Sequence, residues 1–167
     1  MRRSGDDIAD VYAAHFRPLS VQLYAYTGDL DVAQELVQEA FARAIPRWNR
    51  ISTYDDPVAW LRRVAFNLAA SRWRRVRVAR VYARRQLPEE VGVEPGPEHV
   101  ALVAALAKLP DRHRRAVVMH HVGDVPVAEI ARLEGAPEGT VRVWLHRGRA
   151  ALAAELAEAW EEGGSHV

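Results

Sequence analysis

The segment from Gln86 to Pro97, QLPEEVGVEPGP, constrains the fold most because it divides the chain into two parts. It contains three Pro and two Gly and lacks any helical repeat of apolar residues. Such a composition is typical of an extended tether, since Pro cannot continue a helix and Gly disfavours one. We therefore expect two small packed domains joined by a flexible linker. Their ranges are 1–85 for the first domain, 86–97 for the linker, 98–162 for the second domain and 163–167 for a short tail.

Both parts repeat apolar residues at helical spacing. After the break at Thr27-Gly28-Asp29, one such stripe runs from Ala33 to Ala44, and a second one runs from Leu61 to Leu68. No segment alternates with period two for long enough to predict a strand, so the fold class we expect is all-α. In the second part, helices are expected near 98–108, 111–121, 126–133 and 137–161.

Charge is balanced overall but segregated along the chain. Lys and Arg number 23 against 22 Asp and Glu, and 49% of the residues are hydrophobic, enough for real cores. The absence of Cys excludes disulfides and thiolate metal sites and fits a reducing compartment. The sequence contains neither a long apolar run nor a signal-peptide pattern, so we expect a cytoplasmic protein without direct membrane insertion.

Positive charge concentrates between Pro57 and Pro88, where no Asp or Glu occurs. Nine Arg are interleaved there with Trp60, Phe66 and Trp73. Guanidinium groups attract phosphates and aromatic rings stack on exposed bases, so this mixture favours nucleic acid, including single strands. The alternative is that the aromatic residues pack on a neighbouring helix and the arginines are merely solvated. A helical wheel predicts one outward half that carries Arg62, Arg63, Phe66, Asn67, Trp73, Arg74 and Arg77.

A helix-turn-helix is predicted in PVAEIARLEGAPEGTVRVWLHRGRAAL. Gly135 supplies the turn, Pro137 can begin the second helix, and Val141, Leu145 and Gly148 form its buried side. We expect Gly148 to let a neighbouring helix approach closely and Trp144 to serve packing. The alternative is an ordinary helical hairpin with a solvated basic face. The outward strip available for a DNA groove contains Thr140, Arg142, Val143, His146, Arg147 and Arg149.

Four blocks in order carry a family resemblance over about residues 20–160. The blocks are QELVQEAFARA, DDPVAWLRRVAFNLAASRWRR, ALAKLPDRHRRAVVMHHV and EGTVRVWLHRGRAAL. Together they resemble the extracytoplasmic-function group of bacterial sigma-70-type factors. The resemblance implies a specificity subunit of RNA polymerase that binds core polymerase and promoter DNA, opens the strands without ATP and is held inactive by an anti-sigma factor.

The resemblance also implies roles for individual residues. The carboxylates of Asp31, Glu35 and Glu39, spaced four residues apart, would face a basic polymerase surface, although spacing alone fits a solvated strip. The implied core-polymerase-binding residues are Asp31, Glu35, Leu36, Gln38, Glu39 and Phe41. Those implied for the minus-ten element, with a flipped base held by the loop 49–56, are Arg50, Ser52, Thr53, Tyr54, Trp60, Arg63, Phe66, Asn67, Trp73 and Arg74. Those implied for the minus-35 element are His120, Thr140, Arg142, Val143, His146, Arg147 and Arg149.

Several positions depart from the family pattern. Val143-Trp144 replaces a small polar residue and Arg, which points to an altered minus-35 sequence. Val32 replaces an acidic residue, His120 replaces an Arg that contacts the DNA backbone, and Pro126 stands where Ser often caps a helix. We expect these changes to affect specificity rather than class.

Catalytic residues, metal ligands and cofactors are not predicted. The chain has no Gly-rich phosphate loop, nucleophile elbow or paired-carboxylate motif. His120 and His121 diverge by about 100° on a helix, so they do not form a metal cluster with His113. Two alternatives stay open from the residues alone: a stand-alone helix-turn-helix regulator of duplex DNA, and, more remotely, a DNA-cleaving enzyme.

Overall fold

The computed structural model describes residues 7–76 and 96–164, and within these ranges the chain is helical without strands, as the sequence predicts. Most of the expected linker lies outside the described residues. The first part contains α1 (Ile8–Thr27), α2 (Leu30–Ala44), the 3-10 turn η1 (Ile45–Arg47), α3 (Trp48–Ile51) and α4 (Pro57–Val76). The second part contains α5 (Pro97–Ala107), α6 (Asp111–Val117), the π-helical turn η2 (Val118–Val122), α7 (Val127–Glu134) and α8 (Glu138–Gly164).

The N-terminal unit is a bundle of α1, α2 and α4. Local sequence sets its helix ends: Asp29 accepts a hydrogen bond from the Val32 amide at 3.1 Å, and Gly28, with φ of 76°, ends α1 in the left-handed conformation. The apolar stripes of the helices then meet in a closed core. Its fully buried members include Leu23, Val37 and Ala65.

The C-terminal unit packs α5, α6 and α7 on the long helix α8. Gly135, with φ of 63°, makes the turn between α7 and α8, and Pro137 precedes α8 as predicted. Gly148 lies directly against α6, where an added Cβ would stand 2.6 Å from a methyl carbon of Val117. The expected close approach at Gly148 is thereby confirmed. The helix predicted at 111–121 changes at Val118 into the π-helical turn.

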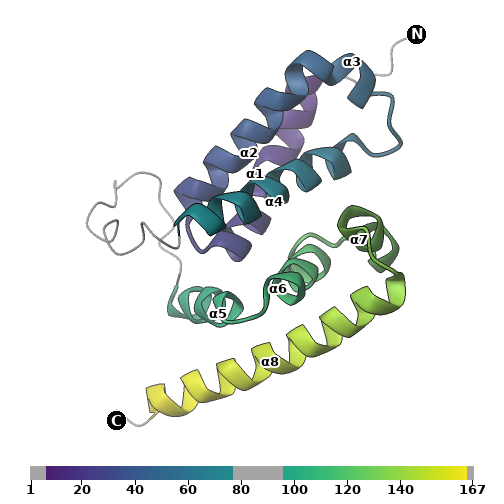
Figure 1. The fold of residues 1–167 in the computed structure, drawn as a ribbon. Coiled ribbons are helices and arrows are strands. Elements are labelled where there is room, and N and C mark those ends of the chain that lie inside the picture. The colour runs from purple at the N-terminus through teal and green to yellow at the C-terminus, as the bar shows by residue number, and fades with distance from the viewer. Residues whose placement is uncertain (1–6, 77–95, 165–167) are drawn as a thin grey trace.

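The two units pack against each other. Figure 1 shows α5, α6 and α7 between the N-terminal bundle and α8, with α6 and α7 next to α4. Buried apolar residues of both units belong to one continuous cluster that includes Leu19 of α1 and Met119 of η2. Arg62 and Phe66 of α4 are therefore buried against the C-terminal unit, where they contact Glu129 and Arg115.

Candidate nucleic-acid and polymerase interfaces

The acidic strip of Asp31, Glu35 and Glu39 is exposed along α2. Glu39 pairs with Arg43 at 2.9 Å, and Glu35 pairs with Arg72 of α4 at 2.9 Å. Gln38 is exposed beside the strip. Exposed pairs of this kind are weak, so a basic partner surface can replace them. Leu36 and Phe41 from the same predicted set are buried in the bundle, where they fix the orientation of α2.

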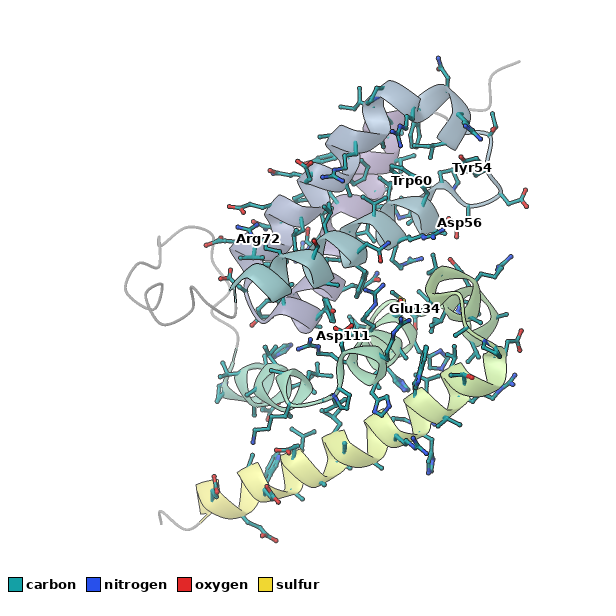
Figure 2. All side chains as sticks on the ribbon, in the orientation of Figure 1. Tyr54, Asp56, Trp60, Arg72, Asp111 and Glu134 are labelled. Carbon is teal, nitrogen blue, oxygen red and sulfur yellow. The ribbon has the colours of Figure 1, made fainter. Side chains whose placement is uncertain are left out.

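A pocket of about 380 Å³ opens where η1, α3 and the following loop meet the start of α4. Figure 2 shows Tyr54 and Trp60 together at this end of α4, with Arg72 at the other end. Arg50, Tyr54 and Trp60 of the predicted minus-ten set share this pocket. Its lining residues are Pro46, Arg47, Asn49, Arg50, Ile51, Tyr54 and Trp60.

Ser52 and Thr53, two loop residues of the predicted minus-ten set, stabilise the conformation of the loop instead. The Thr53 hydroxyl donates to the carbonyl oxygen of Arg50 at 2.6 Å, and the Ser52 hydroxyl donates to that of Asn49 at 3.4 Å. They tighten the turn after α3 without lining the pocket. Arg47 was missed by the sequence analysis, although it stands three residues before Arg50 and so lies on the same helical side.

The predicted outward half of α4 is wrong for Arg62 and Phe66, which are both buried. Phe66 is 0% exposed and packs against Tyr26 at a ring separation of 5.2 Å, which is the packing alternative left open above. Arg63 and Asn67 are exposed, as expected. The error arises because α4 has protein on two sides. The side chains of Trp73, Arg74 and Arg77 lie outside the described residues.

Arg62 is buried between charged and polar partners. Its guanidinium donates to Gln22 Oε1 at 3.2 Å and to Glu129 of α7 at 3.3 Å. Burial lowers the pKa of Arg62, and Glu129 opposes that effect. Burial and the carboxylate of Asp56 raise the pKa of Glu129, against the attraction of Arg62.

The second helix of the helix-turn-helix presents its predicted strip to solvent. Arg142, Val143, His146, Arg147 and Arg149 are exposed, and Thr140 is half-buried. Val141, Leu145 and Gly148 hold the opposite side of α8 against the unit. Trp144 is half-buried with the Arg112 guanidinium 5.6 Å from its ring centre, consistent with the packing role predicted for it.

His120 lies beside this strip, together with a residue that the sequence analysis did not assign to DNA. Nδ1 of His120 is 2.9 Å from the carbonyl oxygen of Val125, so this nitrogen carries a hydrogen and donates it. His121 Nε2 lies 3.5 Å from the Arg149 guanidinium. Burial, with smaller effects from His120 and Arg149, lowers the pKa of His121.

The described residues contain no group of three or more His, Asp or Glu that could hold a metal ion. None of the helices in residues 7–76 and 96–164 is both long and apolar enough to cross a membrane. An exposed basic helix in one unit and a pocket lined by arginine and aromatic residues in the other define a class: helix-turn-helix proteins with a second candidate surface for nucleic acid.

Comparison with known proteins resolves that class further. The family described as Sigma-70 region 2 matches residues 11–78, and Sigma-70, region 4 matches residues 99–152. The RNA polymerase sigma-E factor of Streptomyces antibioticus is 35% identical, covering 74% of this chain and 70% of that protein. The ECF RNA polymerase sigma factor SigW of Bacillus subtilis is 27% identical over 91% of this chain and 88% of its own length.

A solved structure agrees in fold. The sigma factor RpoE from Bartonella quintana, in complex with the anti-sigma factor NepR, superposes with a TM-score of 0.74 at 20% identity, covering 91% of this chain and 98% of that one. The chain belongs to the extracytoplasmic-function group of the sigma-70 family and is an alternative RNA polymerase sigma factor. The resemblance inferred from its motifs is confirmed.

Proposed function

We propose that this sigma factor directs core RNA polymerase through three separate surfaces: the acidic strip on α2, the loop pocket before α4 and the recognition helix α8. The single observation that carries the proposal is the loop pocket, which gathers arginine and aromatic side chains at the start of α4. Strand opening then draws on binding energy, and the chemistry of RNA synthesis belongs to the polymerase.

The acidic strip supports docking on a basic surface of core polymerase. Asp31, Glu35 and Glu39 recur every four residues, which places their carboxylates on one side of α2. These carboxylates are exposed and accessible to a partner, while Leu36 and Phe41 on the opposite side of α2 are buried in the bundle and hold the helix in place. Charge complementarity of this type mainly raises the association rate and selects the partner.

The loop pocket supports capture of one unstacked base of the minus-ten element. Extruding a base costs a few kcal/mol, and stacking on an aromatic ring returns about 1–3 kcal/mol per base. Tyr54 and Trp60 offer such rings, and Arg47 and Arg50 offer donors to phosphate or base oxygens. We assign Asn67 and Arg63 to the neighbouring single-stranded bases because both are exposed on α4.

The exposed strip of α8 supports binding in the major groove of the minus-35 element. Arg142, Arg147 and Arg149 supply bidentate donors for guanine or phosphate, and Val143 supplies an apolar contact suited to a thymine methyl group. Because the Nδ1 hydrogen of His120 is bound to the Val125 carbonyl, only the opposite ring nitrogen can face a phosphate.

In vitro transcription with core polymerase tests the proposal. On a promoter library, the added protein should start defined transcripts, and Arg147→Ala should reduce initiation only on templates that contain the minus-35 element. The loss of one good base contact corresponds to about 1–3 kcal/mol of discrimination between base pairs. Equal loss on templates without that element would remove Arg147 from sequence reading. Tight promoter binding without polymerase, together with no transcription, would instead favour a stand-alone regulator.

We propose that an anti-sigma factor regulates this chain. The solved relative from Bartonella quintana is in complex with the anti-sigma factor NepR, which supports this class of partner. A candidate anti-sigma factor should compete with core polymerase for the purified protein in a pull-down. Undiminished polymerase binding at saturating candidate would reject that candidate.

A further inference from the structure

The outer side of α8 is bare of other helices in the part of the chain that the structure describes. Figure 1 shows α5, α6 and α7 all on one side of α8. The buried residues Val141, Leu145 and Gly148 face these helices. The exposed residues of the opposite side recur every three or four positions and are Val143, Arg147, Ala150, Ala154, Ala157 and Glu161. We call this set the outer face of α8. Its spacing is the one with which two helices pack along each other.

Large apolar side chains are exposed at both ends of this face. Val143 is 43% exposed near the start of α8, and Trp160, which borders the face near the end, is 71% exposed. Trp is the residue type that contributes most when an interface forms, because its ring buries a large area. The alanines between these two residues allow a second helix to approach to about 8–10 Å between the axes. The face is therefore able to bury apolar surface against another helix.

The two halves of α8 carry opposite charge. The first half exposes Arg142, Arg147 and Arg149. After Arg149 the described part of α8 contains no basic residue, and its acidic residues are Glu155, Glu158, Glu161 and Glu162. Glu155 pairs with Lys108 at 2.8 Å, whereas the other three make no ion pair within the described residues.

The acidic end of α8 is unfavourable for an isolated helix. Glu161 and Glu162 lie in the last turn, which contains no basic residue. The C-terminal end of a helix carries partial negative charge, so carboxylates there are destabilising, and Glu158 and Glu162 also repel each other at a spacing of four residues. A cationic partner beside Glu161 would remove this cost. The exposed arginines in the first half of α8 are such cations.

We propose that the outer face of α8 binds the same face of a second copy of this chain in antiparallel orientation, which gives a two-fold symmetric dimer. Antiparallel pairing places the basic half of each helix beside the acidic half of the other, and the symmetry repeats every contact. With the two-fold axis near Ala154, Arg147 lies beside Glu161 of the partner subunit and Ala150 lies beside Ala157 of the partner subunit. A parallel orientation would instead bring like charges together.

The dimer is weak and reversible. With 27 residues, α8 is about 40 Å long, and only the part after Val143 takes part in the pairing. A contact between two such helices buries less than the roughly 1,600 Å² of a standard interface. The ion pairs are exposed, so added salt weakens the association.

Self-association covers part of the strip assigned to minus-35 DNA. Arg147 and Val143 belong to both surfaces, so a second copy and duplex DNA exclude each other; this consequence rests on the function proposed for α8. The acidic strip on α2 stays exposed in the same protein. Polymerase can thus bind a chain whose recognition helix is still covered.

Charge reversal tests the pairing in the full-length protein by sedimentation velocity over a range of concentrations. The chain contains no Cys, so covalent disulfide dimers do not interfere. Arg147→Glu and Glu161→Arg each bring like charges together at both symmetry-related contacts, and each alone should raise the dimer dissociation constant about ten-fold or more. An equal mixture of the two variants should regain association, because both contacts then join opposite charges. Glu162→Arg is the matched control, since it makes the same charge change about 100° away on the helix and should associate like wild type.

Trp160→Ala should also raise the dimer dissociation constant about ten-fold, because two indole rings are lost from each dimer. A wild-type protein that stays monomeric at its highest soluble concentration would overturn the dimer. A mixture that associates no better than the separate variants would reject the antiparallel pairing. A loss in Glu162→Arg as large as that in Glu161→Arg would show that general charge, rather than the outer face, controls association.

A duplex minus-35 oligonucleotide tests the competition separately. Its addition should convert wild-type dimers into DNA-bound monomers. Trp160→Ala lies outside the strip assigned to DNA, so it should bind the duplex as tightly as dilute wild type and should not weaken as protein concentration rises. Dimers that persist on saturating duplex would overturn the exclusion. No duplex binding by monomeric Trp160→Ala would refute the role proposed for α8 in DNA recognition and leave the dimer standing.

Discussion

Replacing Gly148 with Ala separates two effects that act in opposite directions on α8. Gly in a helix interior costs about 1 kcal/mol relative to Ala, so propensity alone predicts that Gly148→Ala stabilises the protein. The structure opposes this gain, because the new Cβ would stand 2.6 Å from Val117 Cγ2 and 3.3 Å from the carbonyl oxygen of His113. Val117 is buried and β-branched, and the His113 carbonyl is part of the backbone of α6. Neither neighbour can therefore move easily.

Overpacking of this kind costs about 1–3 kcal/mol. The second close contact, with the backbone carbonyl oxygen of His113, places Gly148→Ala in the upper part of that range, so we expect a net loss of about 1–2 kcal/mol in the free energy of unfolding. Gly139→Ala is the matched control, because Gly139 lies in the first turn of the same helix and a Cβ added there would have nothing within 4 Å. That variant should gain up to about 1 kcal/mol.

Urea unfolding followed by circular dichroism gives both free energies. Adding Val117→Ala to Gly148→Ala should recover part of the loss relative to the sum of the single changes, because the double variant removes the clash. The reasoning is refuted if Gly148→Ala stabilises the protein as much as Gly139→Ala does.

Three further predictions concern single side chains. Burial and Asp56 raise the pKa of Glu129, with Arg62 and Arg132 opposing. The stability that this carboxyl contributes is therefore present below its ordinary pKa and lost as pH rises through the raised value, and Glu129→Gln should remove this pH-dependent step from thermal melts. Burial and the hydrogen bond to Asp111 raise the pKa of Tyr26 to about 12, so its contribution should persist to pH 10 and vanish toward pH 12, and Tyr26→Phe should remove the highest tyrosinate absorbance step. Trp60→Ala should weaken single-stranded minus-ten binding about ten-fold, by loss of stacking worth about 1–3 kcal/mol, whereas Trp60→Phe should retain most of it and duplex minus-35 binding should not change in a fluorescence assay.

Local signals in the sequence predict the helices and the recognition strip well. Gly28 and Gly135 adopt the left-handed conformation at the expected helix ends, and α8 exposes the expected arginines. Both features depend on neighbours within one turn of the chain. The buried position of Phe66 depends instead on α1 and α6, which are distant in sequence. A helical wheel gives the direction of a side chain but not what lies in that direction.

Glu134 offered a signal that the sequence analysis did not use. It follows Val127, Ile130 and Ala131 in the i, i+3, i+4, i+7 pattern, so a carboxylate stands on the buried stripe of α7. A carboxylate there requires a buried cationic partner, since an unpaired buried charge is strongly unfavourable. The pattern could therefore have predicted an ion pair inside the unit, although not that Arg115 continues from it to α4.

We expect the buried ion pair between Arg115 and Glu134 to orient the Arg115 side chain rather than to add net stability. Desolvation of two buried charges offsets much of their attraction, and apolar replacements of similar volume are often neutral or stabilising by about 1–4 kcal/mol. We therefore expect the double variant Arg115→Met, Glu134→Leu to unfold at a urea concentration equal to or above that of wild type, since exposed Arg112 can lose its partner to water at little cost. A double variant that unfolds at a lower urea concentration than wild type would show instead that the ion pair adds net stability to the C-terminal unit.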